Sequence, residues 1–411
     1  MGDRLPYERG TLLRSTSDDH AKLRAAWRVV RARIEDGLPV VNLTGLERSL
    51  SAGDVDPGLL DDELAPALLG ERLVELGLEH LGGVAGEHDV FLANRTTAAL
   101  VATMQVVVPE GGVVVGVSAG YTHPAVVRAV ELAGGRLVDT VGADAFLAAL
   151  DAEPRVDVVV LTRLAVTYEA LELGEVERIV AAAMARRAVV VADDAGGARV
   201  CPAVLGQPRT LELGVDVAAT GLDKYGVTGP RLGLLGGRRD LVDAIRARAI
   251  ELGVEARPLF VPAVVHSLER YRQERVRELV ATTQELGDAL ERRLGPLVTR
   301  TPFALKLRGD DLLREAPGAQ AVPVEATAAV AMQLLRDHGL LTVHFAAVPP
   351  GTPDLLLKFV PPETLASLGG AEALAALIAD SVERSLPLIA DLDRLRKLLF
   401  GAPLPAPDRT A

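Results

Sequence analysis

The sequence predicts an α/β protein whose main domain is a mostly parallel β-sheet covered by helices on both faces. Short runs rich in β-branched residues alternate with amphipathic stretches between residue 88 and about residue 250. Apolar strands separated by helices are typical of a parallel sheet buried on both sides. The alternation ends after Gly253, so we expect a second, smaller α/β domain beyond that point.

The individual elements follow from the same patterns of apolar spacing. The strands expected in the main domain are Val113–Val117, Leu137–Val141, Val156–Leu161, Ala188–Ala192, Val215–Ala219 and Arg231–Leu235. The helices expected between them include Pro124–Leu132, Ala143–Leu150 and Gly174–Ala185. Beyond Gly253 the pattern predicts one extended helix over Val261–Leu294, strands Phe303–Leu307, Leu341–Phe345 and Leu355–Val360, and helices Val324–His338 and Ala371–Phe400.

These elements divide the chain into four expected parts. Residues 1–45 form an N-terminal arm, whose charged helix near Asp18–Glu35 packs on the smaller domain or on a partner subunit. Residues 46–255 form the large domain, and residues 256–400 form an interdomain helix with the small C-terminal domain. Residues 401–411 are rich in Pro and Ala and are expected to be a loose tail.

Composition excludes several classes of function. The chain has 411 residues, 49% of them hydrophobic and 24% charged, which is typical of a soluble globular protein. No apolar run approaches the roughly 20 residues that a membrane-spanning helix needs, and no apolar segment resembling a signal peptide follows Met1. The net charge of −12 argues against a tRNA or DNA partner. The single cysteine, Cys201, excludes an internal disulfide and a cysteine-cluster metal site, and indicates a cytoplasmic protein.

Lysine is rare in this chain, which makes each lysine informative. Arginine supplies 39 of the 44 basic residues, and the lysines are Lys22, Lys224, Lys306, Lys358 and Lys397. Arginine stays protonated and cannot form an imine, so a lysine does chemistry that arginine cannot replace. Lys224 lies in a glycine-rich turn after an apolar strand, which suits a Schiff-base nucleophile. The alternative is a solvated lysine in a loop.

Two further motifs precede Lys224 in the expected large domain. The segment Asn94–Leu100 is a polar turn that enters a helix, and a helix N-terminus can bind a phosphate, although a threonine there often serves only as a cap. Asp193 and Asp194 follow a buried strand, at the edge where parallel sheets bind ligands. A carboxylate there can pair with a protonated pyridine nitrogen, or it can simply cap a turn.

Taken in order, the helix start, the strand-end aspartate and the strand–turn–lysine resemble the pyridoxal-phosphate enzymes of fold type I, the aspartate aminotransferase superfamily. The segment from Gly214 to Gly233, with its Asp223-Lys224 pair, is similar to a signature of the selenocysteine synthase (SelA)-like group. Val41–Gly45 resembles that group's Asn-x-Thr-Gly opening, and Val261–Tyr271 resembles the start of its interdomain helix. Similarity to tryptophanase-like β-eliminating lyases is more distant.

The resemblance implies a fold and a cofactor. The fold is aspartate aminotransferase-like, with a large, mostly parallel seven-stranded sheet domain and a smaller C-terminal α/β domain. The cofactor is pyridoxal 5'-phosphate, and no metal is implied. Lys224 would form the internal aldimine, and Asp193 would pair with the pyridine nitrogen, with Asp194 as the alternative.

The resemblance also implies the remaining cofactor contacts. Arg95, Thr96 and Thr97 would hold the phosphate. The ring that stacks on the cofactor would come from Gly120–Pro124, with His123 as the first choice and Tyr121 as the second.

This sequence departs from the family pattern at two positions. Many relatives have a phosphate-binding Ser three residues before the lysine, where this chain has Gly221, so Thr220 is a weaker candidate. Relatives often bind the substrate carboxylate with an Arg where this chain has Lys358, a less directional ligand. The alternative carboxylate ligands are Arg163, Arg199 and Arg231, for each of which a surface ion pair is the competing interpretation.

We therefore expect a homodimeric, or higher, cytoplasmic pyridoxal-phosphate enzyme that acts on a small amino acid. A lyase that eliminates or replaces a group at Cβ is the leading hypothesis, because SelA-like relatives that do not use tRNA are mostly lyases. An aminotransferase or an aldolase that cleaves Cα–Cβ is the alternative. A non-catalytic binding protein of the same fold is a further alternative, against which the retained Lys224 argues.

Overall fold

The computed structural model describes residues 5–401, which divide into two compact units. The large unit is Leu46–Glu278. The small unit consists of residues 5–45 and 279–401. The boundary at residue 278 falls inside α10 (Gln273–Leu294).

The large unit contains one seven-stranded sheet with the strand order β2-β8-β7-β6-β5-β3-β4. Its strands are β2 (His88–Ala93), β3 (Val113–Ser118), β4 (Arg136–Val141), β5 (Val158–Leu161), β6 (Val189–Asp193), β7 (Val217–Gly221) and β8 (Gly233–Arg238). Neighbouring strands are parallel except that β8 runs antiparallel to both β7 and β2. The predicted mostly parallel, seven-stranded sheet is therefore confirmed.

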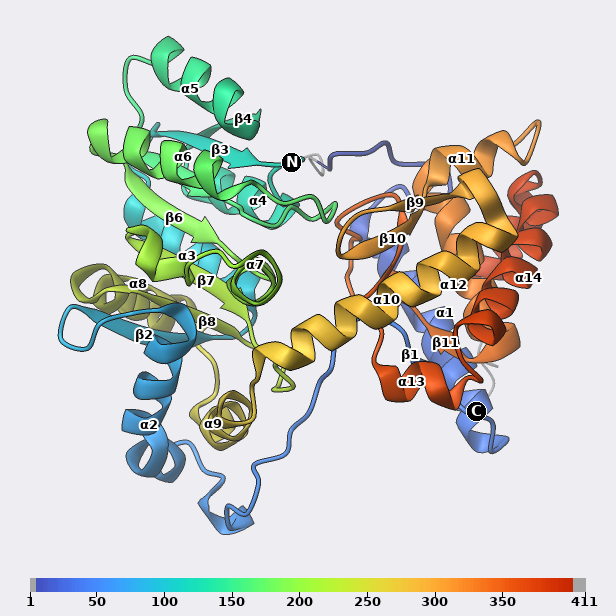
Figure 1. The fold of residues 1–411 in the computed structure, drawn as a ribbon, viewed down its shortest axis with the longest axis horizontal. Helices are drawn as coiled ribbons and strands as arrows, with labels where there is room; N and C mark the ends of the chain where they lie inside the picture. The colour runs from blue at the N-terminus through green and yellow to red at the C-terminus, as the bar shows by residue number, and fades with distance from the viewer. Residues whose placement is uncertain (1–4, 402–411) are drawn as a thin grey trace, which may run out of the picture. The chain divides into compact units, whose positions relative to one another are not determined.

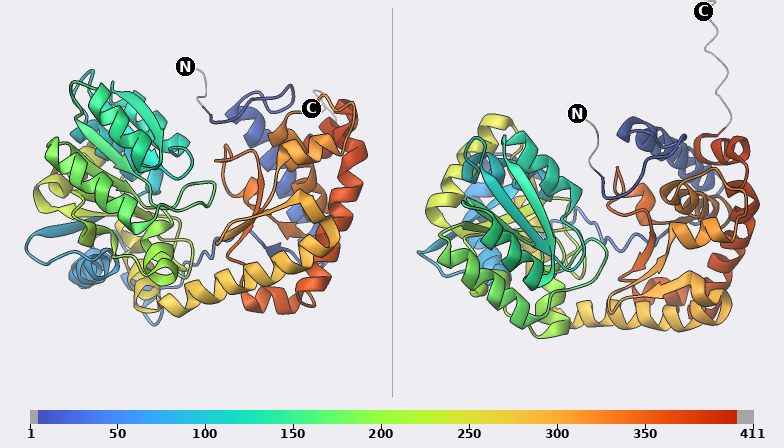
Figure 2. Two further views of the ribbon diagram at one scale, coloured as in Figure 1. Left: turned by 45° about the horizontal axis from the view of Figure 1, so that its top comes forward. Right: turned by 90° about the horizontal axis from the view of Figure 1, so that it is seen from above.

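Helices cover both faces of this sheet (Figures 1 and 2). One face packs against α3 (Thr96–Val107), α4 (Pro124–Leu132) and α8 (Arg239–Leu252). The other packs against α2 (Leu64–Leu81), α5 (Gly142–Ala152), α6 (Leu173–Ala185), α7 (Gly197–Leu205) and α9 (Val261–Glu269). Side chains alternate along each strand, so Val190 and Ala192 belong to one core and Val191 to the other. Asp193 shares the parity of Val191 and points to the face covered by α3.

The small unit is built around two short sheets. A three-stranded antiparallel sheet has the order β12-β10-β9, and a two-stranded parallel sheet joins β1 to β11. These strands are β1 (Val41–Asn42), β9 (Val298–Arg300), β10 (Ala304–Leu307), β11 (Leu340–Leu341) and β12 (Leu355–Lys358). The helices are α1 (Thr16–Glu35), α11 (Gly309–Arg314), α12 (Pro323–His338), α13 (Pro362–Ser367), α14 (Ala371–Ile389) and α15 (Leu392–Phe400). Short 3-10 helices in the two units are η1 (Pro57–Leu59), η2 (Thr210–Leu213), η3 (Pro258–Phe260), η4 (Gly295–Leu297) and η5 (Val343–Phe345).

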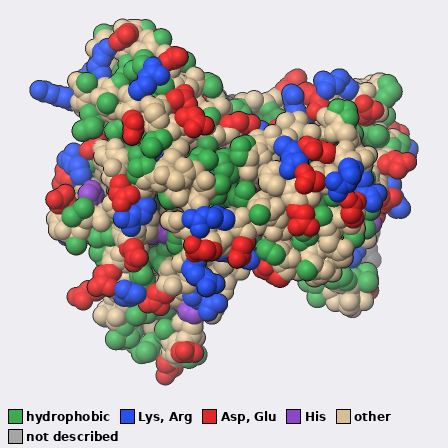
Figure 3. All heavy atoms as spheres, in the orientation of Figure 1, with side chains coloured by type: hydrophobic (Ala, Val, Ile, Leu, Met, Phe, Trp, Pro, Cys, Tyr) green, Lys and Arg blue, Asp and Glu red, His purple; other side chains and the backbone are tan. Residues whose placement is uncertain are grey.

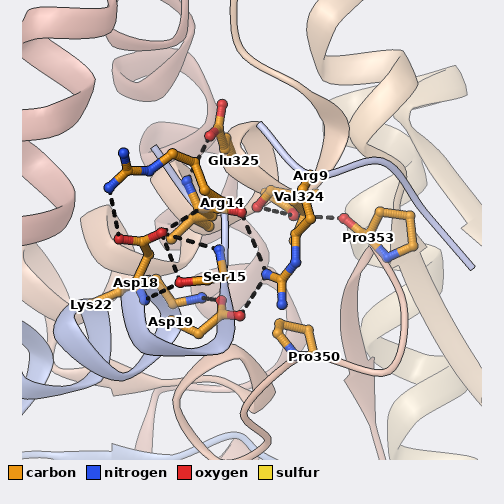
Figure 4. A network of polar contacts seen from close by, with 12 residues as sticks. Arg9, Arg14, Ser15, Asp18, Asp19, Lys22, Val324, Glu325, Pro350 and Pro353 are labelled. Atoms are coloured by element: carbon orange, nitrogen blue, oxygen red, sulfur yellow. Dashed lines mark hydrogen bonds and ion pairs between the residues drawn. The ribbon is translucent and has the colours of Figure 1, made fainter. Parts of the chain in front are cut away.

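The N-terminal arm is fixed to the small unit by buried polar contacts (Figure 4). The Asp19 carboxylate accepts from Arg9 Nη1 at 2.6 Å and from Lys22 Nζ at 3.4 Å, and both Asp19 and Lys22 are fully buried. Glu325 of α12, also buried, accepts from the backbone N–H of Leu12 at 2.6 Å. Buried charges are tolerated only when they are paired, so these contacts tie α1 and the segment before it to α12.

Three element predictions are wrong in detail. The single helix expected over Val261–Leu294 is two helices, α9 and α10, because the chain turns at Tyr271, whose ring packs edge-on against His80 of α2 with centroids 4.9 Å apart. The helix expected over Ala371–Phe400 is also two, because Asp391 caps α15 and restarts the helix there. The strand expected over Leu341–Phe345 is mostly η5. Most of the tail predicted to be loose lies outside the described residues.

Charged side chains of both signs are interspersed on the face shown in Figure 3. Many form surface ion pairs within one unit, such as Arg136 with Glu153 and Arg178 with Asp144. Pairs of this kind contribute little to stability, about 0–1 kcal/mol each. Among residues 5–401, no helix combines the length and the apolar character that crossing a membrane requires.

Candidate active site

Lys224 lies in the turn that follows β7, and Gly221 at the end of that strand gives its side chain room. A Cβ at position 221 would stand 2.7 Å from Lys224 Cε, 3.2 Å from Lys224 Nζ and 3.3 Å from Thr96 Oγ1. The lysine amine and the threonine hydroxyl therefore border the same small space. The turn continues through Tyr225 and Gly226, whose φ angles are +56° and +89°.

The electrostatic surroundings of Lys224 favour its uncharged amine. Burial lowers the pKa of the Lys224 ammonium below its ordinary value, and the positive charges of Arg199 and Arg231 lower it further. The carboxylates of Asp223 and Asp193 act in the opposite direction. A lowered pKa raises the fraction of the amine that is uncharged, which is the property an imine-forming lysine needs.

Asp193 ends β6 and is buried with one oxygen unpartnered. Its side chain is 4% exposed, and its Oδ1 has no hydrogen-bond partner. Burial and the neighbouring Asp194 raise the pKa of the Asp193 carboxyl to about 7, while Lys224 and the Ala195 N–H lower it. An unpaired buried carboxyl costs stability and calls for an explanation, and a cationic ligand group that pairs with it supplies one.

Asp194 has a structural partner that Asp193 lacks. Its Oδ2 accepts from Arg163 Nε at 3.0 Å, from Arg163 Nη2, and from Thr210 Oγ1 at 2.7 Å. Arg163 is fully buried and also donates to the carbonyl of Pro208 at 2.8 Å. Asp194 is therefore engaged in holding the loop before β7, which favours Asp193 as the ligand-pairing carboxylate. Arg163 is committed to the same ion pair, which argues against its predicted contact with substrate.

The N-terminus of α3 faces Lys224 with its backbone amides uncapped by any side chain. Arg95 precedes the helix with φ +88° and ψ 153°, and Thr96 is its first residue. Gly233 of β8 allows this close approach, because a Cβ there would lie 2.7 Å from Thr96 N. A non-glycine residue with these φ and ψ angles is strained, and strained residues cluster at functional sites. Thr96 and Thr97, both partly buried, open a helix start that fits a phosphate.

Three arginines gather beside this helix start. The β2–β8 register ends at Ala93 and Gly233, two residues from Arg95 and Arg231, and the charge of Arg95 acts on Arg231. The β7–β8 register ends at Gly221 and Gly233, and the charge of Asp223 also acts on Arg231. Arg48, which the sequence patterns did not single out, donates from Nε to Asp223 Oδ2 at 2.9 Å.

This arginine row carries an excess of positive charge. Burial, and then the charges of Arg95 and Arg48, lower the pKa of the Arg231 guanidinium to about 10. Asp223 is the carboxylate that opposes them; burial acts to raise its pKa, but Lys224 and Arg48 hold it below its ordinary value. Positive charge concentrated beside a helix N-terminus predicts an anionic ligand.

His123 lies at the start of α4 and interacts electrostatically with Lys224. Its Nδ1 accepts from the Ala125 N–H at 3.0 Å, and burial together with the charges of Lys224 and Arg128 lowers the pKa of His123 to about 4. The ring is therefore neutral. Tyr121 is also partly buried, two residues earlier. His123 caps its helix, and both rings stay candidates for the stacking position.

The remaining predicted residues have other surroundings. Thr220 is buried, and its hydroxyl lies 3.4 Å from the carbonyl of Ala195. Arg199 is fully buried behind the site on α7. Lys358 belongs to the small unit, where it ends β12, is buried, and lies against Gly45 of the N-terminal arm.

Gly221→Ala is expected to displace the Lys224 side chain and to weaken cofactor binding about tenfold or more. The new methyl group would overlap Lys224 Cε and crowd Thr96 Oγ1, while the backbone conformation at 221 accepts alanine. Cofactor affinity measured by fluorescence titration checks this. Gly174→Ala is the matched control, because a Cβ there meets nothing within 4 Å. Equal affinities in both variants would contradict the geometry described above.

The chain resembles known proteins in sequence and in structure. No family model matches the chain. It is 28% identical over 388 residues to a UPF0425 pyridoxal phosphate-dependent protein of Methanothermobacter thermautotrophicus, covering 93% of this chain and 97% of that protein. It is 30% identical over 322 residues to a UPF0425 pyridoxal phosphate-dependent protein of Methanopyrus kandleri, covering 77% of this chain and 83% of that protein.

Solved structures share the fold at low sequence identity. Aspartate aminotransferase of Thermotoga maritima matches with a TM-score of 0.54 and 17% identity, covering 87% of this chain and 96% of that one. Serine palmitoyltransferase of Sphingomonas wittichii matches with a TM-score of 0.59 and 14% identity, covering 84% and 88%. The predicted aspartate aminotransferase-like fold is therefore confirmed.

Proposed function

This chain belongs to the UPF0425 family of pyridoxal phosphate-dependent proteins, and we propose that it is an enzyme that uses Lys224 to process a small amino acid. One observation carries the proposal. Around one lysine of lowered pKa, the large unit gathers a buried carboxyl with an unpartnered oxygen and an uncapped helix start beside an arginine row. A surface lysine needs none of these neighbours.

The polar groups around Lys224 match the charged groups of pyridoxal phosphate. The Asp193 Oδ1 lacks a partner inside the protein, and a protonated pyridine nitrogen is a cation that would satisfy it. The amides of Thr96 and Thr97, with Arg95, would hold the phosphate. His123, or in its place Tyr121, would cover the ring. Lys224 would supply the amine.

The chain's own residues perform the acid–base chemistry. Bound pyridoxal phosphate supplies an electron sink for charge that develops at the substrate Cα. Lys224, whose pKa is lowered by its surroundings, would supply the amine that holds the cofactor and would remove a proton from the substrate as a general base. Asp193 would pair with the pyridine nitrogen and hold a proton there.

Arg231 is the favoured ligand for the substrate carboxylate within the large unit. Arg163 is bound to Asp194, and Arg199 is fully buried, whereas Arg231 is partly exposed beside the α3 start. Lys358 of the small unit stays a second proposed carboxylate ligand, on the strength of the resemblance alone. A guanidinium gives the more directional contact of the two.

We propose elimination or replacement at Cβ as the reaction, with transamination or Cα–Cβ cleavage as the alternative. The likeness of the Asp223-Lys224 segment to the SelA-like group supports the lyase proposal. Incubation with a panel of amino acids separates the two. Keto acid with free ammonia supports the lyase, whereas amino-group transfer to an added keto acid without ammonia release would exclude it.

Borohydride reduction of the cofactor-loaded chain tests the proposed role of Lys224. Reduction should fix one cofactor to the protein, and peptide mapping should find it on Lys224 and on none of the other lysines, Lys22, Lys306, Lys358 and Lys397. Cofactor found on a different lysine, or no fixed cofactor at all, would refute the proposal.

We also propose a homodimer or higher homo-oligomer that works in a reducing cytoplasm. The only cysteine, Cys201, is a free, buried thiol, as in proteins that do not rely on disulfides. Light scattering of the purified chain measures the oligomer size.

A further inference from the structure

Arg199 is a buried cation whose surroundings the cofactor site does not explain. Its side chain is fully buried on α7, and no carboxylate among residues 5–401 lies within ion-pair distance of it. Its Nε has no hydrogen-bond partner. A buried guanidinium without a counter-charge is costly, so its retention calls for a function.

The two ends of the Arg199 guanidinium hold different elements. Nη2 donates to the carbonyl of Ala195 at 2.7 Å, and Nη1 lies 3.2 Å from Nε2 of His80 on α2. Burial and the charge of Arg199 lower the pKa of His80 to about 3, so this ring is neutral and accepts from the arginine at Nε2. Tyr271 packs edge-on against the same His80 ring. Arg199 therefore ties the Ala195 turn to α2.

The Ala195 peptide connects Arg199 to the residues proposed to bind the cofactor. Ala195 lies two residues after Asp193, and its N–H lowers the pKa of the Asp193 carboxyl. Its carbonyl, besides Arg199, accepts from the Gly221 N–H and the Thr220 hydroxyl, both at 3.4 Å. One peptide thus links the strand end that carries Asp193 to the strand end that leads to Lys224.

We propose that Arg199 is a positioning residue that fixes the Ala195 turn between Asp193 and the Lys224 loop and, through its uncompensated charge, keeps the Lys224 amine ready to react. The proposal rests on the proposed function of Lys224. Several titratable groups act on the pKa of Lys224. Asp223 and Asp193 raise it, Arg231 and Arg199 lower it, and His123 is neutral. Of the two cations, Arg199 is the fully buried one, where charge acts over the longest range.

The opposing charges around Arg199 do not cancel it. Burial lowers the pKa of the Arg199 guanidinium, and the groups that raise it are Tyr271, Tyr225, Asp223 and Asp194. Both tyrosines have their pKa values raised, mainly by burial, and stay neutral. Asp194 is paired with Arg163, and Asp223 is paired with Arg48. The charge of Arg199 keeps a lowering effect on the pKa of Lys224 in the presence of these groups.

The pH dependence of cofactor capture by the cofactor-free chain tests this proposal. Capture is measured as borohydride-fixed cofactor per chain after a short mixing time, which reports the uncharged fraction of Lys224 and not turnover. The variants are Arg199→Met and Arg199→Gln. The control is Arg277→Met, because Arg277 also donates to a carbonyl of α7, that of Ala203 at 2.7 Å, away from Asp193.

The expected result separates charge from packing. In wild type and in Arg277→Met the capture rate should rise with pH at the same midpoint, because both proteins keep the charge of Arg199. In Arg199→Met and Arg199→Gln the midpoint should move upward, and capture at neutral pH should slow by about tenfold for each unit of the shift. Glutamine keeps a hydrogen-bond donor for the Ala195 carbonyl. The Arg199→Gln variant can therefore be measured even if Arg199→Met does not fold.

Two results would overturn the proposal. An unchanged midpoint in the folded Gln or Met variant would leave Arg199 as a packing residue only. An equal shift in Arg277→Met would show that loss of any arginine tie in this region, and not the charge of Arg199, moves the midpoint. Failure of the proposed function looks different, because wild type itself would then fix no cofactor at any pH, and both proposals would fall.

Discussion

Lys224→Ala is expected to lower turnover by about four to six orders of magnitude, the loss typical of removing a catalytic nucleophile. Alanine offers no amine for the substrate to displace and no base to remove its proton. The visible absorbance of lysine-bound cofactor should disappear with it. A spectrum recorded on wild type and variant, each purified with pyridoxal phosphate, measures this loss independently of any substrate.

The same substitution should leave the fold intact or slightly stabilise it. A lysine whose pKa is lowered in the folded chain holds its proton less tightly there than in the unfolded chain, which disfavours folding at pH values below its ordinary pKa. Removing the amine removes that cost. Lys397→Ala, at an exposed position on α15, is the control and should keep both the absorbance and the turnover. An unchanged spectrum in Lys224→Ala would contradict the assignment.

The central sheet could be predicted because each strand is a local signal. Val113–Val117 and Val156–Leu161 are apolar along their whole length, as strands buried on both faces must be, and both fall within two residues of the observed bounds. The breaks between consecutive helices could not be predicted from the sequence. The break near Tyr271 depends on His80, almost two hundred residues away in sequence, and the apolar spacing on either side carries no trace of it.

The candidate site divides in the same way. Lys224 and Asp193 stood out because a rare lysine and a strand-end carboxylate are visible in a single stretch of sequence. Arg48 did not, because its meaning depends on Asp223, which the fold brings to it. Arg163 is only a candidate substrate ligand in the sequence, because it lies near a predicted strand end, and its partner Asp194 lies one strand further along the chain.

Asp193→Asn is expected to have opposite effects on catalysis and on stability. Turnover should fall by about two to three orders of magnitude, because an amide cannot hold a proton at the pyridine nitrogen electrostatically. The cofactor-free chain, however, should become more stable above about pH 7. Thermal and urea unfolding of both chains, compared at pH 5 and pH 8, measure the second effect.

The sign follows from the proton balance. The Asp193 carboxyl has an ordinary pKa of 3.8 and a folded-state pKa of about 7, so between these values the folded chain binds more protons than the unfolded chain. Its stability therefore falls as pH rises through that window, by at most about 4 kcal/mol. Asparagine cannot ionise, so the Asp193→Asn variant does not lose this stability as the pH rises. Wild type should recover it by binding the cofactor, whose cationic nitrogen would pair with the carboxylate.

Asp194→Asn is the matched comparison, because it makes the same change at the adjacent residue. Its expected effect on the stability of the cofactor-free chain is the opposite one. It would leave the fully buried Arg163 without a counter-charge and should destabilise the chain by about 3–5 kcal/mol at neutral pH. If Asp193→Asn destabilised the cofactor-free chain to a similar extent, Asp193 would have a structural partner too. Its unpartnered oxygen would then no longer support the cofactor site. The two neighbouring aspartates therefore have different roles. Asp194 stabilises the fold, whereas Asp193 costs stability and is available to a ligand.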